Sequence, residues 1–124
     1  MDKLLSGRRV LVVEDEMLVL IMIEDMLADL GCKSVSSAAT VDKALALINE
    51  QDFDVAMLDM NLNDIDSRIV AEALVARKIP FFYSTGNTSR SLKDGYSDRP
   101  VLKKPFKYQE LAAILTRLKL APIE

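Results

Sequence analysis

The sequence predicts an α/β domain built on an open parallel β-sheet with helices on both faces. Two continuous apolar runs, at residues 10–13 and 55–58, each end in acidic residues. Continuous rather than alternating apolar runs are typical of strands that are buried on both faces, as in parallel sheets. Segments with helical periodicity separate the predicted strands, and such alternation requires crossover helices that cover both faces of the sheet.

Three further strands complete the predicted sheet. Residues 34–36 are a weak candidate, residues 80–83 form an aromatic run before Ser84-Thr85-Gly86, and the short pair Val101-Leu102 precedes Lys103-Lys104-Pro105. Strand and helix therefore alternate five times along the chain.

Four segments carry apolar residues at helical spacing. Thr40 is a suitable N-cap for the second of them, and Gly31 stands where the first should end. A fifth segment, residues 87–99, is rich in Ser, Gly, Asp and Asn and predicts only a short or unstable helix. The predicted apolar faces are Leu18, Met22, Met26 and Leu30; Ala44, Leu47 and Ile48; Ile69, Ala73 and Ala76; and Leu111, Ile114, Leu115 and Leu118.

Length and composition narrow the class of protein. The 124 residues, half of them hydrophobic, suit one compact domain over residues 1–124, with no room for an output domain. The net charge of −3 and the scattered basic residues do not resemble a nucleic-acid-binding surface. The longest apolar run, residues 17–23, is too short to span a membrane, and residues 1–9 do not resemble a signal peptide. We therefore expect a cytoplasmic protein without a membrane or nucleic-acid partner.

The content of metal-binding residues narrows the chemistry. The chain has no histidine, which is the commonest ligand of transition metals and the usual general base. A metal site would therefore use mainly oxygen ligands, which favours Mg²⁺ or Ca²⁺. Cys32 is the single cysteine, so no internal disulfide can form, and we expect a small core residue there.

Polar residues follow the predicted strands at the ends where parallel sheets bind ligands. In open sheets of strand order 2-1-3-4-5, ligands bind outside the carboxyl ends of strands 1 and 3. That order brings Glu14, Asp15 and Asp59 together, with Thr85 and Lys104 at the ends of the next two strands. Crowded carboxylates favour a hard dication, and a carboxylate can itself attack phosphorus. Mg²⁺, a lysine and a hydroxyl would stabilise such a phosphoryl transfer.

Each of these residues also has a simpler interpretation when it is considered alone. Asp15 could cap the first helix, Asp59 could be a loop acid, Thr85 could belong to a turn, and Lys104 could be a solvated charge. The shared placement of all of them at one end of the parallel strands favours a common site.

Four segments together resemble the receiver domain of two-component response regulators. The resemblance extends from about Arg9 to Leu118 and implies a flavodoxin-like fold of strand order 2-1-3-4-5. It also implies phosphorylation of an aspartate by a partner histidine kinase. The matching segments are Val10-Leu11-Val12-Val13-Glu14-Asp15-Glu16, Leu58-Asp59-Met60, Ser84-Thr85-Gly86 and Lys104-Pro105-Phe106.

The resemblance assigns a role to each matching polar residue. Asp59 is the phosphoacceptor. Asp15 is a direct ligand of Mg²⁺, and Glu14 acts on the ion through water. Ca²⁺ or Mn²⁺ can take the place of Mg²⁺. The backbone carbonyl of Asn61 completes the protein ligands of the metal. In the family a lysine and a hydroxyl contact the phosphoryl group, and the matching residues of this chain are Lys104 and Thr85. The peptide before the family's proline is often cis, which makes the Lys104–Pro105 peptide a candidate here.

The sequence also departs from the family pattern. The loop after the acceptor usually contains a proline and a glycine, whereas here residues 61–66 read NLNDID. Val101 replaces the aromatic residue whose ring usually turns inward on activation. Residues 80–86 partly match a receiver subgroup marked by PFxFATGY, whose stand-alone members occur in alphaproteobacteria, often with histidine kinases of the HWE class.

The expected function is that of a single-domain response regulator. It would signal to a downstream protein or act as a phosphate sink, with at most slow self-dephosphorylation rather than enzyme turnover. A phosphatase or phosphotransferase with Asp59 as nucleophile is one alternative, but haloacid-dehalogenase-like enzymes carry a second aspartate where this chain has Asn61. A flavodoxin-like nucleotide-binding protein is rejected because it needs a Gly- or Ser/Thr-rich phosphate loop after the first strand, where this chain has Glu14-Asp15-Glu16, which would repel phosphate without a metal. A receiver-shaped binding module that is never phosphorylated remains the other alternative, although all the site residues are present.

Overall fold

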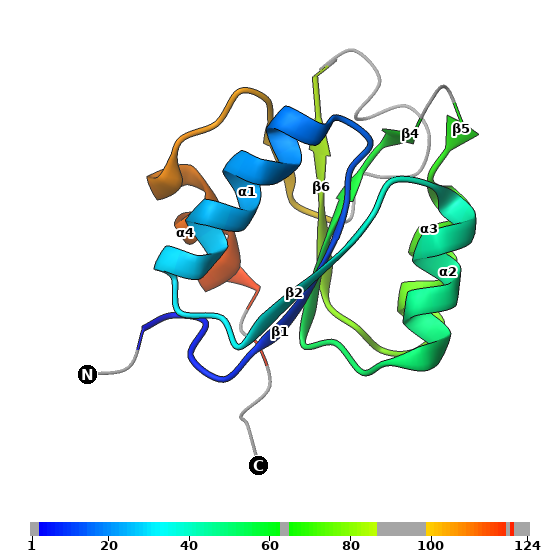
Figure 1. Ribbon diagram of the computed structural model, residues 1–124, viewed down its shortest axis with the longest axis horizontal. Helices are drawn as coiled ribbons and strands as arrows, with labels where there is room; N and C mark the ends of the chain where they lie inside the picture. The colour runs from blue at the N-terminus through cyan, green and yellow to red at the C-terminus, as the bar shows by residue number, and fades with distance from the viewer. Residues whose placement is uncertain (1–2, 63–64, 87–98, 119, 121–124) are drawn as a thin grey trace.

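The computed structural model describes residues 3–62, 65–86, 99–118 and 120. A five-stranded sheet lies at the centre of these residues, with two helices over each face (Figure 1). The strand order is β2-β1-β3-β6-β7 and every neighbouring pair is parallel. Counted along the chain, this is the order 2-1-3-4-5, so the predicted fold class is confirmed.

The elements follow the predicted alternation of strand and helix. The sheet strands are β1 (Arg9–Val13), β2 (Ser34–Ala38), β3 (Val55–Asp59), β6 (Phe81–Thr85) and β7 (Val101–Lys103). The helices of the described residues are α1 (Met17–Asp29), α2 (Val41–Glu50), α3 (Arg68–Ala76) and α4 (Tyr108–Arg117). An antiparallel hairpin that the sequence did not predict, β4 (Asn61–Leu62) with β5 (Ile65–Asp66), follows the end of β3.

Two apolar clusters, one on each face of the sheet, explain the continuous apolar runs. Leu11 and Val13 of β1 face α2 and α3, whereas Val10 and Val12 face α1 and α4. All five residues of β3 are buried. Successive side chains of a strand point to opposite faces, so a strand covered on both sides is apolar along its length, and in β3 the exception is Asp59 at the carboxyl end.

Two of the four predicted helix faces are confirmed. In α2 the Thr40 hydroxyl accepts a hydrogen bond from the Lys43 amide at 3.1 Å, which is the expected N-cap. The residues predicted to be buried in this helix are buried, and in α4 the predicted face is buried, with Leu118 half-buried at its end.

The predicted faces of the other two helices are confirmed only in part. At the end of α1, Leu30 is buried and Met26 packs against the core as predicted. Leu18, however, is 83% exposed, and the helix itself buries Leu20, Ile23 and Leu27. Residues 17–23 are apolar all round, so helical spacing alone could not select one stripe. In α3, Ala73 packs against the core as predicted, but Ile69 is 51% exposed and Ala76 is exposed. The buried residues of this helix are Val70, Ala71 and Leu74.

The amino-terminal segment closes the end of α1. Gly31 follows the helix with φ of +88°, a conformation that favours glycine, and confirms the predicted helix end. Leu5 is fully buried and its amide donates to the Leu30 carbonyl at 2.9 Å. Cys32 packs beside the α1 side of the core as expected, and burial raises the pKa of its thiol.

The helix expected within residues 87–99 falls mostly outside the described part of the chain, so it stays a prediction. None of the helices formed by the described residues combines the length and the apolar character needed to cross a bilayer.

Candidate functional site

The carboxyl ends of β1 and β3 lie side by side and bring three carboxylates together. The parallel register pairs Val13 with Leu58, so Glu14 and Asp59 follow as neighbours. Carboxylate oxygens of Glu14, Asp15 and Asp59 all lie within 4.8 Å of one another. Glu14 and Asp59 are buried and Asp15 is half-buried. The structure therefore assembles the acidic cluster that the strand order predicts.

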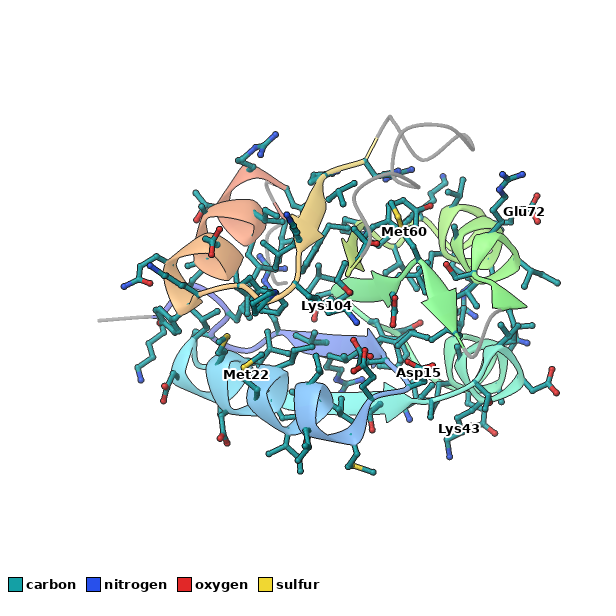
Figure 2. All side chains as sticks on the ribbon, turned by 90° about the horizontal axis from the view of Figure 1, so that it is seen from above. Asp15, Met22, Lys43, Met60, Glu72 and Lys104 are labelled. Carbon is teal, nitrogen blue, oxygen red and sulfur yellow. The ribbon has the colours of Figure 1, made fainter. Side chains whose placement is uncertain are left out.

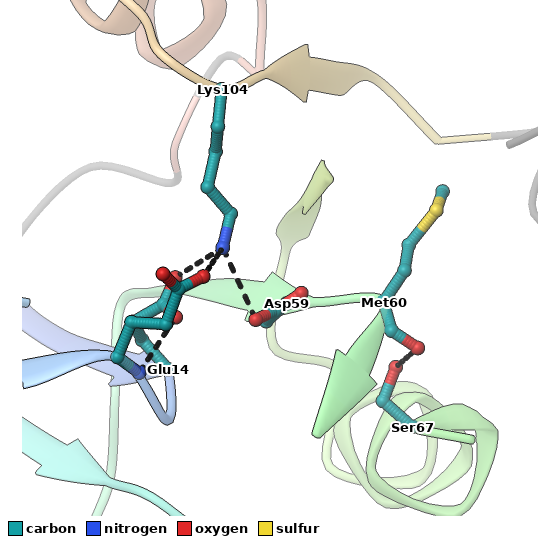
Figure 3. A network of polar contacts seen from close by, with 6 residues as sticks. Glu14, Asp59, Met60, Ser67 and Lys104 are labelled. Carbon is teal, nitrogen blue, oxygen red and sulfur yellow. Dashed lines mark hydrogen bonds and ion pairs between the residues drawn. The ribbon is translucent and has the colours of Figure 1, made fainter. Parts of the chain in front are cut away.

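Lys104 reaches into this cluster from the end of β7. Its Nζ lies 2.8 Å from Glu14 Oε1, 3.2 Å from Asp59 Oδ2 and 3.5 Å from Glu16 Oε1 (Figure 3). Figure 2, which looks onto this edge of the sheet, shows Lys104 and Asp15 over the strand ends. The Lys104–Pro105 peptide is cis, as expected.

The backbone holds the charged side chains in place. The Glu14 amide donates to the Ala38 carbonyl of β2 at 2.9 Å. The Glu16 amide donates to Glu14 Oε2 at 3.0 Å, which orients the carboxylate whose other oxygen faces Lys104. The Lys104 amide donates to the Thr85 carbonyl at 2.8 Å and ties the lysine to the end of β6.

The electrostatics of the site favour a cation beyond Lys104. Burial raises the pKa of Glu14 to about 7, and the charge of Asp59 adds to the rise, although the hydrogen bond from Lys104 opposes it. Burial lowers the pKa of Lys104, but the Glu14 hydrogen bond and the Asp59 charge outweigh it, so the net shift is upward. Negative charge is thus in excess, and the crowded oxygens suit a hard dication such as Mg²⁺.

The remaining predicted residues lie on the same edge. Thr85 is the buried last residue of β6. The backbone of Asn61 begins the β4–β5 hairpin, two residues after Asp59. Val101, which replaces the usual aromatic residue, is half-buried in β7 and pairs in register with Tyr83.

Sequence reasoning assigned no role to two residues beside the site. Glu16 contacts the Lys104 ammonium, and the third position of the run Glu14-Asp15-Glu16 was a signal that could have indicated this. Ser67 donates its hydroxyl to the Met60 carbonyl at 2.9 Å, and no sequence pattern indicated that contact.

Comparison with known proteins agrees with this geometry. A model of the response regulator receiver domain matches residues 10–116. The solution structure of SdrG from Sphingomonas melonis Fr1 is 41% identical, with 90% of this chain and 96% of that chain covered and a TM-score of 0.77. The BeF3-activated conformation of SdrG from Pseudomonas melonis Fr1 is also 41% identical, with 91% and 97% covered and a TM-score of 0.79.

A third structure bears on the metal. The receiver domain of the sensor histidine kinase PA1611 from Pseudomonas aeruginosa PAO1, with a magnesium ion coordinated in its active-site cleft, is 29% identical. The alignment covers 91% of this chain and 98% of that domain, with a TM-score of 0.75. The comparison with curated proteins found no match. The family match, the fold and the acidic cluster agree, and the chain belongs to the receiver domains of two-component response regulators.

Proposed function

We propose that this receiver domain accepts a phosphoryl group on Asp59 from a histidine kinase in the presence of Mg²⁺. The observation that carries the proposal is the Lys104 ammonium, which lies between buried Glu14 and Asp59 inside the acidic cluster. An ion pair with no task beyond stability would not need several crowded carboxylates around one lysine, because burial of charge is costly.

The residues present fit a bound Mg²⁺. Asp15 and Asp59 would be direct carboxylate ligands, Glu14 would act through water, and the Asn61 backbone carbonyl would complete the protein's set. Ca²⁺ or Mn²⁺ could occupy the same oxygen ligands. When bound, the ion supplies positive charge that relieves the repulsion among the carboxylates and offsets charge on the incoming phosphoryl oxygens.

The transfer itself uses side chains of this chain. A carboxylate oxygen of Asp59 forms a bond to phosphorus while the phosphorus–nitrogen bond of the kinase phosphohistidine breaks, and its electron pair stays on the imidazole nitrogen. Lys104 Nζ, 3.2 Å from Asp59 Oδ2, is placed to exchange its carboxylate partners for a phosphoryl oxygen. The Thr85 hydroxyl would donate to a second oxygen. This chemistry makes the chain a phosphoacceptor, with slow self-dephosphorylation at most.

The exposed residues at the start of α1 are a candidate contact surface for the kinase. Met17, Leu18 and Ile21 are 67%, 83% and 48% exposed beside the acidic cluster. Large apolar side chains grouped at a surface favour a protein partner. The partial PFxFATGY match suggests a kinase of the HWE class. The signal would leave through contacts with a downstream protein, or the domain would act as a phosphate sink.

Incubation with acetyl phosphate and Mg²⁺ tests the proposal. The wild type should gain the mass of one phosphoryl group, which base removes, and Asp59→Asn should gain none. Asp15→Asn should weaken Mg²⁺ binding while the fold is retained. Phosphorylation of Asp59→Asn at the wild-type rate would refute the assignment of the acceptor. Capture of a protein by the phosphorylated form alone would favour signalling over a phosphate sink.

A further inference from the structure

We propose that Ser67 is a positioning residue for the metal site. Its hydroxyl would hold the peptide group between Met60 and Asn61 and thereby aim the backbone carbonyl of Asn61. The inference rests on the proposed function, because it assumes that Asn61 and Asp59 serve a bound Mg²⁺.

Ser67 is placed like a helix cap but is used differently. It immediately precedes α3, where a serine side chain normally accepts a hydrogen bond from the first turn, yet it makes no such bond. The side chain is fully buried and the hydroxyl instead donates to the Met60 carbonyl at 2.9 Å, across seven residues (Figure 3). The helix start is served by the Ser67 carbonyl, which accepts from the Val70 and Ala71 amides at 3.0 and 3.1 Å.

The Met60 residue is fixed on both sides by these contacts. Its amide donates to the Ser84 carbonyl of β6 at 3.0 Å, and its carbonyl accepts from the Ser67 hydroxyl. The Ser67 amide also donates a longer hydrogen bond, of 3.4 Å, to the same carbonyl. Met60 stands between the acceptor Asp59 and the proposed ligand Asn61, so the orientation of its carbonyl sets the direction in which the chain leaves the acceptor.

The β4–β5 hairpin explains how this contact can affect the position of Asn61. The hairpin pairs Asn61 with Asp66, and Met60 and Ser67 are the next residues outward, so their hydrogen bond closes the base of the hairpin. The proline and glycine that usually shape this loop in receivers are absent from residues 61–66. A buried hydrogen bond between side chain and backbone therefore takes over the shaping of the loop. Groups that orient metal ligands from outside the coordination sphere commonly alter metal affinity about tenfold or more when they are removed.

The test compares Mg²⁺ affinity by isothermal titration calorimetry, well below the melting temperatures of all variants. Ser67→Ala should weaken Mg²⁺ binding about tenfold. Ser67→Cys has a larger sulfur atom but a thiol that donates only weakly, and its affinity should lie between those of Ser67→Ala and the wild type. Thr116→Ala is the control for the loss of a hydroxyl. The Thr116 hydroxyl also donates to a backbone carbonyl, that of Ala112 in α4, at 2.9 Å, but far from the site. Arg77→Ala, at the opposite edge of the sheet, should lower the melting temperature but leave the affinity for Mg²⁺ unchanged. It shows whether lower stability alone weakens Mg²⁺ binding.

A second measurement needs no metal. The carbonyl carbon chemical shift of Met60 should change in Ser67→Ala and remain unchanged in both controls. Wild-type affinity for Mg²⁺ in Ser67→Ala and Ser67→Cys, beside clear binding by the wild type, would overturn the inference alone. Absence of Mg²⁺ binding by the wild type would overturn the proposed function and the inference together.

Discussion

The two edges of the sheet carry similar charged residues in opposite arrangements. At the carboxyl edge, where the strands end, the Lys104 ammonium contacts the carboxylates of Glu14, Glu16 and Asp59. At the amino edge, where the strands begin, each pair joins one base to one acid. Arg8 lies 3.7 Å from Asp54, and Arg77 lies 3.2 Å from Asp52.

Burial separates the two edges further. The Lys104, Glu14 and Asp59 side chains are 10%, 1% and 6% exposed. At the amino edge the Arg8 side chain is 14% exposed, but its partner Asp54 is 35% exposed, and Arg77 and Asp52 are 38% and 91% exposed. A balanced, solvated pair contributes little and is easily satisfied by water. A buried cluster with excess negative charge costs stability unless a cation joins it. The comparison indicates that the carboxyl edge is arranged for ligands, while the ion pairs of the amino edge are balanced without one.

Removal of the Lys104 side chain should change the free energy of unfolding more than any other substitution at the two edges. In metal-free buffer at pH 8, Lys104→Ala leaves Glu14 and Asp59 buried without their shared cation, and it should lower the free energy of unfolding by about 3 kcal/mol. Chemical denaturation measures the loss. Lys103→Ala, an exposed neighbour, is the control and should change stability by less than about 0.5 kcal/mol. An equal loss in both variants would show that the charge cluster is not responsible.

Addition of Mg²⁺ should act on the carboxyl edge alone. A ligand that binds only the native state at 100 times its dissociation constant raises the free energy of unfolding by about 2.7 kcal/mol. The wild type and Arg77→Ala should gain equally at that concentration, and Asp15→Asn should gain much less. Thermal melts with and without the ion measure the effect. A melting temperature that Mg²⁺ leaves unchanged in the wild type would contradict the metal site.

The stability of the metal-free protein should fall as pH rises. The pKa of Glu14 is about 7 in the fold against an ordinary value of 4.5, so the folded protein binds more protons than the unfolded chain between these values. Stability is therefore greatest below this window and is lost through it, by about 3 kcal/mol, since one pKa unit is worth about 1.4 kcal/mol. The raised pKa of Lys104 contributes nothing to the slope below pH 8.

Substitution of Glu14 tests whether this residue is the group that causes the dependence on pH. Glu14→Gln cannot ionise and should flatten the dependence of stability on pH between about 5 and 8 in EDTA. Glu16→Gln should keep the wild-type slope, because its side chain is 65% exposed. A slope that survives in Glu14→Gln would assign the titration to another group.

The sequence predicted the sheet and the members of the acidic cluster, because both depend on short local patterns. The continuous apolar run at residues 10–13 is typical of a strand buried on both faces, and the expected strand order then placed Glu14 beside Asp59. Only the resemblance to receivers supplied the expected role of the Asn61 backbone carbonyl, which no spacing could have given.

The parts that sequence reasoning missed depend on tertiary contacts. Leu18 and Leu20 are equally apolar, and only the packing of α1 on the sheet decides that Leu20 is buried. The β4–β5 hairpin has two-residue strands, too short to show an alternating pattern. The bond from Ser67 to Met60 depends on how that hairpin closes, so nothing in the local sequence indicates it.

The smallest predicted effect lies at the amino edge and concerns Arg77. Its Nη1 donates to the Ile48 carbonyl at 2.6 Å, and its Nη2 lies 3.2 Å from Asp52. The last four carbonyls of a helix have no partner within the helix, and Ile48 is one of these in α2. A cation at a helix carboxyl end is also favourable. The carbonyl bond should therefore matter more than the ion pair with the exposed Asp52.

Arg77→Ala should consequently lower the free energy of unfolding by about 1 kcal/mol, and Asp52→Asn by less than about 0.5 kcal/mol. Chemical denaturation of both variants separates the two contacts that Arg77 makes. Because Arg77 lies at the edge away from the acidic cluster, neither loss should change on addition of Mg²⁺ or between pH 5 and pH 8. A loss in Asp52→Asn as large as that in Arg77→Ala would mean that the ion pair is the stabilising contact. A loss in Arg77→Ala that Mg²⁺ reverses would mean that the two edges are coupled, and the division of the sheet into a ligand edge and a structural edge would fail.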